Sequence, residues 1–230
     1  MYFSLLFALT SVVSAQTVGT FKSYLKEPVT TREHPVDMLR TIIDVKFDCP
    51  KGEVIGKVTH EFRPLLKTVD SMFLDGPGIE IGEVKMAGNA VNFKKSEKGN
   101  TFYFNPALQW DKEYTMQISY TAKPSRGIYF IGWNDETTDQ HKREWGYVRK
   151  QIWTQGQGVD NRYWIPCYDE GNDKTITETI ITFDRKYQVL SNGVLQSKKE
   201  NKDNTITWHY KMSHPHATYL VMLGIGEFAV

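Results

Sequence analysis

The stretch 113-EYTMQISYTA-122 indicates how this chain folds. Every second residue from position 114 is aromatic or apolar, namely Tyr114, Met116, Ile118 and Tyr120. Successive side chains of a β-strand point to opposite faces, so this alternation predicts a strand that buries one face. The same period of two recurs in 41-TIIDVKFD-48 and 205-TITWHYKM-212, and no long stretch has convincing helical spacing. These patterns are typical of half-buried antiparallel strands.

The composition agrees with a sheet protein. Of the 230 residues, 40% are hydrophobic and 13% aromatic, and flat aromatic rings pack well on pleated sheets. No internal repeat or low-complexity tract interrupts the pattern. We therefore predict one all-β domain with many strands, arranged in two or more packed sheets.

Two further stretches refine the strand prediction. Asn192-Gly193 stands between apolar residues, and both tolerate the positive φ of a tight turn, so a β-hairpin is expected there. The final stretch, 217-ATYLVMLGIGEFAV-230, is apolar at most positions, which predicts a strand covered on both faces. Because such a strand needs cover, we expect the natural chain to continue beyond Val230 or a second body to dock against this edge.

The N-terminus suggests export. Residues 1–15 carry an apolar run too short to span a bilayer, followed by small residues that suit signal-peptide cleavage before Gln16. A basic n-region is absent, since the first Lys or Arg is Lys22. We predict a cleavable signal peptide over 1–15, a polar segment over 16–36 and a β domain over 37–230. No transmembrane segment is expected, and the alternative for 1–15 is a buried strand.

The charge balance excludes partners that need a strong field. The net charge is +1, which provides no overall attraction for nucleic acid or an anionic membrane. The basic pairs Lys94-Lys95 and Lys198-Lys199 lie beside acidic residues and are expected at solvated hairpin tips. We therefore predict no nucleic-acid partner.

The two cysteines, Cys49 and Cys167, leave two alternatives. Export permits a disulfide between them. Two thiols in a large domain are more often separate buried residues, which is the interpretation we favour.

A search for catalytic motifs finds none. His60 begins the stretch HEFRP, but Pro64 stands where a zinc helix H-E-x-x-H needs its second histidine, so His60 is expected to be a strand residue. His214 and His216 could supply two ligands at most, with no cysteine or carboxylate cluster beside them. We predict no catalytic residue and no metal ligand in this chain.

The stretch 154-TQGQGVDNRYWIPCYDEGNDK-174 is the best candidate for a binding site. A strand ending here would project Gln155 and Gln157 from one face, with Gly156 between them allowing close backbone approach by a ligand. Carboxamide oxygens accept hydrogen bonds, so the pair could hold an ammonium group. The alternative is a pair of glutamines that bond across the sheet.

The rest of that stretch is expected to be structural. Four charged residues are predicted to form a clasp that orders the loop: Arg162, Asp169, Asp173 and Lys174. Three further residues are predicted to fix the loop to the core: Trp164, Pro166 and Cys167.

Several motifs, in order, resemble the N-terminal domain of the zinc aminopeptidases of peptidase family M1. The main one is 153-WTQGQGVDNRYWIPCYDEGNDK-174, which is similar to the family's T-Q-x-Q or S-E-G-E core with its following Arg, Pro-Cys, Asp and Lys. Others are 104-FNPALQWDKEYTMQISY-120, 126-RGIYF-130, 191-SNG-193 and 215-PHATYLVMLGIGEF-228. The resemblance covers 37–230.

This resemblance implies a saddle-like domain of antiparallel or mixed strands that packs on a catalytic domain. It also implies that Gln157, with Gln155 beside it, binds the free α-amino group of a peptide and lines the first side-chain pocket. A neutral glutamine, where some members have glutamate, gives weaker capture of an ammonium. The family's G-x-M-E-N and H-E-x-x-H motifs are absent, so Zn²⁺ is expected only in a catalytic domain beyond Val230. The chain alone is then expected to be inactive.

Sequence and resemblance together predict the substrate-recognition domain of an exported zinc aminopeptidase. One alternative is a non-catalytic scaffold of the same fold. Another is a free-standing secreted binding module that uses exposed tryptophans such as Trp110 and Trp133. If the chain is instead the recognition domain of an aminopeptidase, these tryptophans are expected in the core or at a domain interface.

Overall fold

A computed structural model describes residues 32–133 and 149–228. The predicted signal peptide and most of the segment 16–36 lie outside these ranges. Within them are fifteen strands and three short 3-10 helices: β1 (Val36–Asp48), η2 (Cys49–Lys51), β2 (Glu53–Pro64), β3 (Thr68–Asp75), β4 (Glu80–Met86), β5 (Asn89–Ala90), β6 (Asn92–Lys95), β7 (Gly99–Gln109), β8 (Tyr114–Ala122), β9 (Ile128–Ile131), β10 (Gln151–Thr154), η3 (Asn161–Tyr163), β11 (Thr175–Asp184), β12 (Gln188–Ser191), β13 (Val194–Glu200), β14 (Thr205–His216), η4 (Thr218–Leu220) and β15 (Leu223–Gly226). The all-β prediction is confirmed.

The strands with period-two patterns form as expected. In β8, Met116, Ile118 and Tyr120 are buried while the residues between them are more exposed. β1 and β14 show the same alternation, with Ile43 and Trp208 deep in the core. Burial of one apolar face therefore sets the orientation of these strands.

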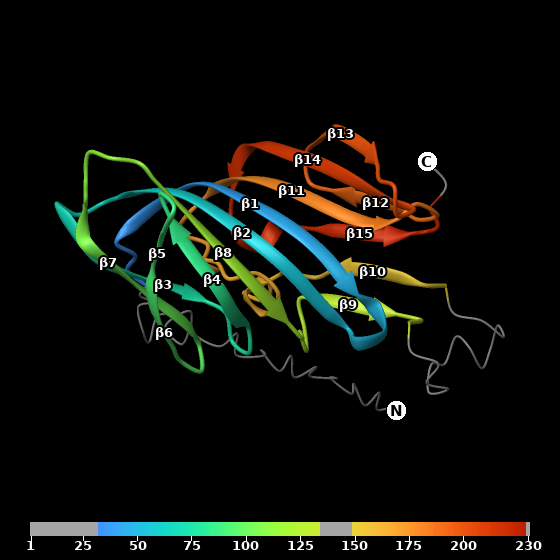
Figure 1. The fold of residues 1–230 in the computed structure, drawn as a ribbon, viewed down its shortest axis with the longest axis horizontal. Helices are drawn as coiled ribbons and strands as arrows, with labels where there is room; N and C mark the ends of the chain where they lie inside the picture. Colours follow the sequence, from blue (N-terminus) through green and yellow to red (C-terminus); the bar gives the residue numbers. More distant parts are fainter. Residues whose placement is uncertain (1–31, 134–148, 229–230) are drawn as a thin grey trace, which may run out of the picture. The chain divides into compact units, whose positions relative to one another are not determined.

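One large mixed sheet organises the domain. Its eight strands follow the order β13-β14-β11-β1-β2-β8-β4-β5, and its long central strands lie side by side in Figure 1. β1 and β11 pair in parallel, whereas the other neighbours are antiparallel.

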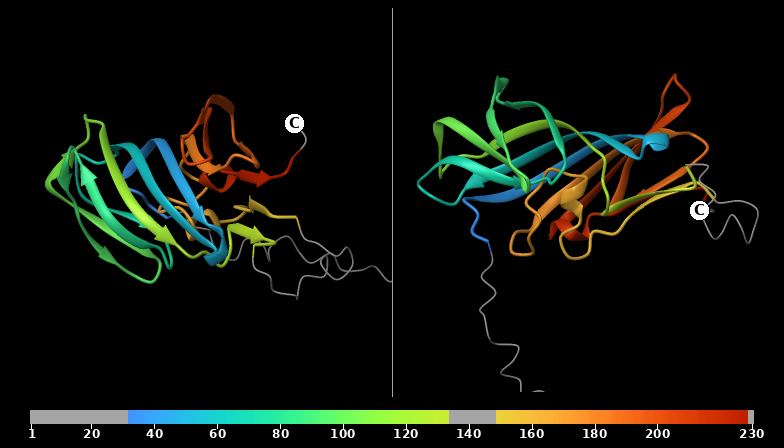
Figure 2. Two further views of the ribbon diagram at one scale, coloured as in Figure 1. Left: turned by 45° about the vertical axis from the view of Figure 1, so that its right-hand side comes forward. Right: turned by 90° about the horizontal axis from the view of Figure 1, so that it is seen from below.

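Two smaller sheets pack on this large sheet (Figure 2). The three-stranded sheet β3-β7-β6 contacts it through Phe104 of β7, whose ring centroid lies 6.3 Å from that of Phe62 in β2. The four-stranded sheet β12-β15-β10-β9 contacts it through Phe130 of β9, whose centroid lies 5.9 Å from that of Phe47 in β1. The predicted packing of two or more sheets is thus confirmed.

The prediction of a β-hairpin at Asn192-Gly193 is wrong. β12 before it pairs with β15 in the four-stranded sheet, whereas β13 after it pairs with β14 in the eight-stranded sheet. Gly193 has φ +82°, as the turn residue should. A Cβ there would lie only 2.0 Å from the carbonyl oxygen of Lys211, so close packing on β14 also requires glycine. The turn sends the chain from one sheet to another.

The prediction of a single long strand over residues 217–230 is also wrong. The chain first makes the 3-10 turn η4, in which Leu220 N donates to Ala217 O at 3.0 Å, and only Leu223–Gly226 pair as β15. Leu220 and Met222 are 49% and 40% exposed, so this apolar stretch is not covered on both faces.

Cys49 and Cys167 are separate buried thiols, as favoured from the sequence. His60 is confirmed as a strand residue of β2 and is fully buried. Its Nε2 lies 2.8 Å from Pro166 O and its Nδ1 3.1 Å from Thr41 Oγ1. Burial lowers the pKa of His60 to about 4, because a charged imidazole would lose its hydration there. His60 is therefore neutral at pH 7.

Candidate functional site

The two candidate glutamines lie just after β10, not within it. The strand ends at Thr154, and Gln155 continues by donating its backbone N–H to Gly127 O at 2.9 Å. Both side chains are exposed, and Gln155 Nε2 donates to Gln157 Oε1 at 3.4 Å. The prediction of one shared strand is wrong because the backbone turns here, with Gly158 at φ +85°. The structure nevertheless places the two carboxamides together, and among residues 32–133 and 149–228 no donor bonds to the Gln155 oxygen.

Gly156 has a different role from the one predicted. A Cβ on this residue would lie 2.4 Å from Asn161 Nδ2 and 2.6 Å from the Tyr219 carbonyl oxygen. The space beside the glycine is therefore filled by the protein itself, and the prediction of close approach by a ligand is wrong. Gly156 lets the loop pack tightly against η3 and η4.

Asn161 was not identified from the sequence, although it organises this loop. It is fully buried, and its Nδ2 donates to Thr218 O at 2.7 Å and to Val221 O at 3.0 Å. Its Oδ1 accepts from Trp164 Nε1 at 2.8 Å. An asparagine in such a polar stretch is typical of any turn, so only the fold identifies its partners.

The loop is fixed to the core as predicted. Trp164 and Cys167 are buried, and Pro166 O accepts a hydrogen bond from Nε2 of His60 in β2 at 2.8 Å. Cys167 also forms an isolated β-bridge to Asp75 at the end of β3, with N–O distances of 2.8 and 3.1 Å. The loop thus joins the eight-stranded and three-stranded sheets.

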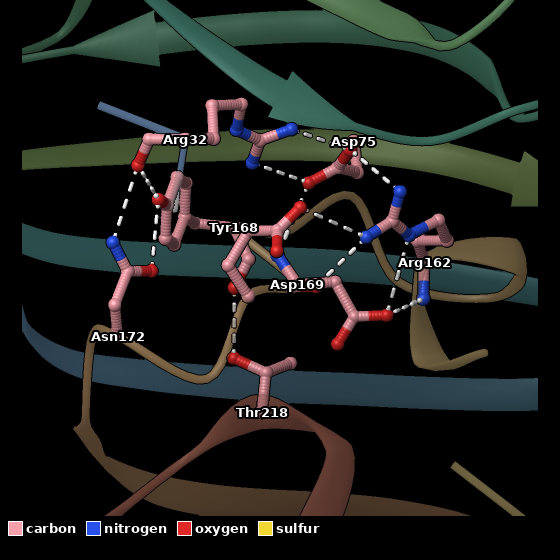
Figure 3. A network of polar contacts seen from close by, with 8 residues as sticks. Arg32, Asp75, Arg162, Tyr168, Asp169, Asn172 and Thr218 are labelled. Atoms are coloured by element: carbon pink, nitrogen blue, oxygen red, sulfur yellow. Dashed lines mark hydrogen bonds and ion pairs between the residues drawn. The ribbon is translucent and has the colours of Figure 1, made fainter. Parts of the chain in front are cut away.

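A buried ionic network holds the same loop (Figure 3). Asp75, which is 1% exposed, accepts a bidentate pair from Arg32 at 2.7 and 2.8 Å. Arg162 Nη1 lies 3.2 Å from Asp75 Oδ1, the oxygen that also accepts from Arg32 Nη1. The backbone N–H of Arg162 donates to Asp169 Oδ2 at 2.9 Å. Glu170 also lies 3.5 Å from Arg162, so three carboxylates face the two guanidinium groups. The buried Asp75 and Asp169 thus have the charged partners that such groups require. Asp75 and Arg32 were missed because their partners lie far along the chain.

The predicted clasp is confirmed for Arg162 and Asp169 but not for Asp173. Asp173 turns away to accept the backbone N–H of Met38 at 3.2 Å and lies 3.5 Å from His34 Nε2. Lys174 is exposed. Burial raises the pKa of Asp169 to about 6, and the hydrogen bond from Arg162 N opposes that rise.

Several exposed apolar side chains lie on β10, on the four-stranded sheet and in the glutamine loop. Trp153 stacks on Tyr129 with ring centroids 4.8 Å apart and is 40% exposed. Trp153 pairs with Gly224, which pairs with Leu190, so one cross-strand row of the four-stranded sheet is open to solvent. Val159 and Tyr219 are also partly exposed. The glutamines are thus two hydrogen-bonding groups that neighbour exposed apolar residues along the chain, since Trp153 precedes them and Val159 follows them.

No group of three or more His, Cys, Asp or Glu side chains in residues 32–133 and 149–228 could hold a metal ion. The residues of this part of the chain therefore do not fit a catalytic zinc, which needs three protein ligands. The same ranges contain no helix long and apolar enough to cross a membrane.

The described residues form an all-β domain in which one loop is fixed between two sheets. The family model for the Peptidase M1 N-terminal domain matches residues 33–220, and the chain belongs to this family. The resemblance inferred from the motifs is thus confirmed.

Individual relatives are aminopeptidases of greater length. The chain is 25% identical to mouse (Mus musculus) Aminopeptidase RNPEPL1 over 67% of its own length, but covers 20% of that protein. It is 24% identical to Leucine aminopeptidase 2 of Vanderwaltozyma polyspora over 80% of its length, covering 27% of that relative. The chain therefore spans about a fifth to a quarter of these relatives.

Solved structures share the fold. The M1 zinc metallopeptidase of Deinococcus radiodurans matches 84% of this chain with a TM-score of 0.70 and 14% identity, and the match covers 43% of that protein. The leukotriene A4 hydrolase of Saccharomyces cerevisiae matches 85% of the chain with a TM-score of 0.66 and 17% identity, over 30% of its own length.

Proposed function

We propose that this domain recognises the N-terminus of a peptide for a zinc-dependent aminopeptidase. The observation that carries the proposal is the exposed pair Gln155 and Gln157, held beside each other on a loop fixed to the core. The names of the relatives support the class of reaction.

The chemistry assigned to the pair is positioning. The α-ammonium of a peptide would donate to the Gln155 oxygen and to the second lone pair of the Gln157 oxygen, which fixes the first peptide bond relative to a catalytic centre. A neutral acceptor stabilises an ammonium less than a carboxylate does, so part of the affinity must come from other contacts. The ion pairs of Arg32, Asp75 and Arg162 keep the loop in place.

The catalytic centre would belong to another domain. When bound there, zinc would activate a water for attack on the first peptide carbonyl. The exposed row of Trp153 and Leu190, with Met222 nearby, supports contact with such a domain, because a large apolar surface is costly to leave in water. Export through a signal peptide over 1–15 is part of the proposal and rests on the sequence alone.

A binding module remains the second candidate, because one observation favours it. Trp110 is 64% exposed at the turn between β7 and β8, and Leu65 and Leu66 are exposed at the turn before β3. Trp110 N donates to Lys67 O at 3.4 Å, which brings the two turns together. Trp133, by contrast, packs on Phe183 with centroids 5.8 Å apart and belongs to the core.

The test is to read the natural reading frame past Val230 and assay its product. We expect the frame to encode H-E-x-x-H, and the product to hydrolyse an amino-acid anilide with a free α-amino group but not its N-acetyl derivative. A frame without zinc ligands, or equal hydrolysis of both substrates, contradicts the proposal. A full zinc motif without activity would favour the non-catalytic scaffold instead.

A further inference from the structure

We propose that Asn161 is a positioning residue that sets the place of Gln155 and Gln157. This inference rests on the proposed function of the pair. It assigns no direct substrate contact to Asn161, which is fully buried.

The orientation of the Asn161 carboxamide is fixed by its partners. Both hydrogen atoms of Nδ2 are used, by the carbonyls of Thr218 and Val221 at 2.7 and 3.0 Å. Oδ1 accepts from the indole of Trp164 at 2.8 Å. The opposite orientation would place Oδ1 against two carbonyl oxygens and NH₂ against an N–H, so it is excluded. The group therefore has one arrangement and is held from three sides.

This fixed group lies directly against the glycine between the glutamines. The place of a Cβ on Gly156 is 2.4 Å from Asn161 Nδ2 and 2.6 Å from Tyr219 O. Asp160 N also donates to Gly156 O at 3.3 Å, and Gln155 N donates to Gly127 O at 2.9 Å. The backbone between the glutamines thus has contacts on several sides. Most of these contacts come from backbone atoms, whereas Asn161 contributes a side chain.

The consequence is a coupling between two segments distant in sequence. Asn161 joins the glutamine loop to residues 218–221, which precede β15 and display Tyr219 and Leu220 at the surface. A shift of that turn would reach Gly156 through the Asn161 carboxamide and the Tyr219 carbonyl. The two glutamines and the apolar turn therefore form one rigid unit.

Asn192 provides a matched control. Its Nδ2 donates to Leu220 O at 3.0 Å and its Oδ1 accepts from Met222 N at 2.6 Å, so it holds the same turn from another side. Unlike Asn161, it is not among the atoms that a Cβ on Gly156 would meet. Loss of Asn192 therefore loosens the turn without removing the contact with the loop.

The first experiment compares Asn161→Ala, Asn161→Ser and Asn192→Ala in the ¹⁵N-labelled protein. We expect both Asn161 variants to shift the backbone and side-chain amide signals of Gln155 and Gln157, and to shift them more than Asn192→Ala does, because Asn192→Ala keeps the contact of Asn161 with the loop. Should Asn161→Ala fail to fold, Asn161→Ser keeps a hydroxyl for one carbonyl and gives the same readout. Unchanged glutamine signals in a folded Asn161 variant overturn the inference.

The second experiment uses the active product of the full reading frame. We expect Asn161→Ala to raise KM for a free-amino anilide by about fivefold while kcat changes by less than about twofold, the pattern of a contact that holds substrate and transition state equally. If Gln157→Ala raises KM but Asn161→Ala does not, this inference fails alone. If Gln157→Ala has no effect on KM, the proposed function fails, whatever the glutamine signals show.

A double substitution tests the contact itself. Gly156→Ala is expected to shift the glutamine signals and lower the melting temperature. In the Asn161→Ala background the added methyl has more room, although Tyr219 O remains nearby, so the second loss should be smaller. Equal losses in both backgrounds would show that the two residues act independently and would contradict the inference.

Discussion

His60 shows how a single buried residue can set the acid limit of this domain. Its imidazole lies in the core between Thr41 and Pro166 and stays neutral, because burial lowers its pKa from 6.5 to about 4. In the unfolded chain the same group takes up a proton near its ordinary pKa. The native state therefore binds a proton less readily than the unfolded state, and acid favours unfolding.

We predict that His60 contributes stability that is present above pH 6.5 and lost as the pH falls toward 4. The loss should amount to about 3 kcal/mol of unfolding free energy. Urea unfolding of the protein and of His60→Gln at pH 7.5 and pH 4.5 measures this loss. Every other titrating group is common to both proteins, so the difference in unfolding free energy between them isolates His60. A difference between the two proteins that does not depend on pH would contradict the prediction.

At the residue scale, sequence patterns pointed to the candidate glutamines but not to the residues that hold their loop. Gln155 and Gln157 are visible because two carboxamides flank a glycine in an aromatic stretch. Asn161 and Asp75 are not visible in this way, because a buried polar residue is recognised only by its partners. The partners of Asn161 lie in η4 and just beyond it, and those of Asp75 lie before β1 and in the loop.

Asp75 is the residue through which the three-stranded sheet holds the candidate site. Replacing it by alanine leaves Arg32 and Arg162 without their shared carboxylate, and removal of one partner from a buried pair costs about 3 to 5 kcal/mol. Arg32 is partly exposed, so the lower end of that range is expected.

The matched control is Asp44→Ala. Asp44 pairs with Lys57 at 3.8 Å at the surface, and such a pair contributes about 0 to 1 kcal/mol. Chemical denaturation of both variants at pH 7 gives the comparison. Similar losses for Asp75→Ala and Asp44→Ala would show that the buried network does not hold the loop.

Gly193 fixes the passage of the chain from β12 to β13. We predict that Gly193→Ala lowers stability by at least about 2 kcal/mol, through positive φ and a clash with the Lys211 carbonyl. Gly78→Ala is the control, since Gly78 has φ +76° but no atom within 4 Å of the added methyl. Equal changes in melting temperature for the two variants would rule out the close packing of this turn on β14.

At the scale of the element, local patterns predicted strands well and pairing poorly. Alternation identified β1, β8 and β14 because one face of each is buried. The parallel pairing of β1 with β11 joins segments far apart in the chain, which no local pattern records. The Asn-Gly turn was assigned to a hairpin for the same reason, since its φ requirement says nothing about which strand β13 meets.

At the scale of the whole molecule, the large sheet is a platform for a loop. His60 of β2 and Asp75 of β3 both contact the loop, and Asn161 of the loop bonds to Thr218 of η4. Three separate elements therefore fix one short segment. Such fixation is what a group that positions a substrate needs, because its orientation must not be lost on binding. This arrangement is consistent with the role in substrate recognition that we propose for the loop.

The most direct test of this account is the Michaelis constant of Gln157→Ala in the active product of the full reading frame. Loss of one hydrogen bond to an ammonium should raise KM for a free-amino anilide about tenfold. Gln117→Ala, which removes an exposed glutamine from β8, should leave KM unchanged. An unchanged KM in Gln157→Ala, or an equal rise in Gln117→Ala, would contradict the assignment of substrate recognition to this loop.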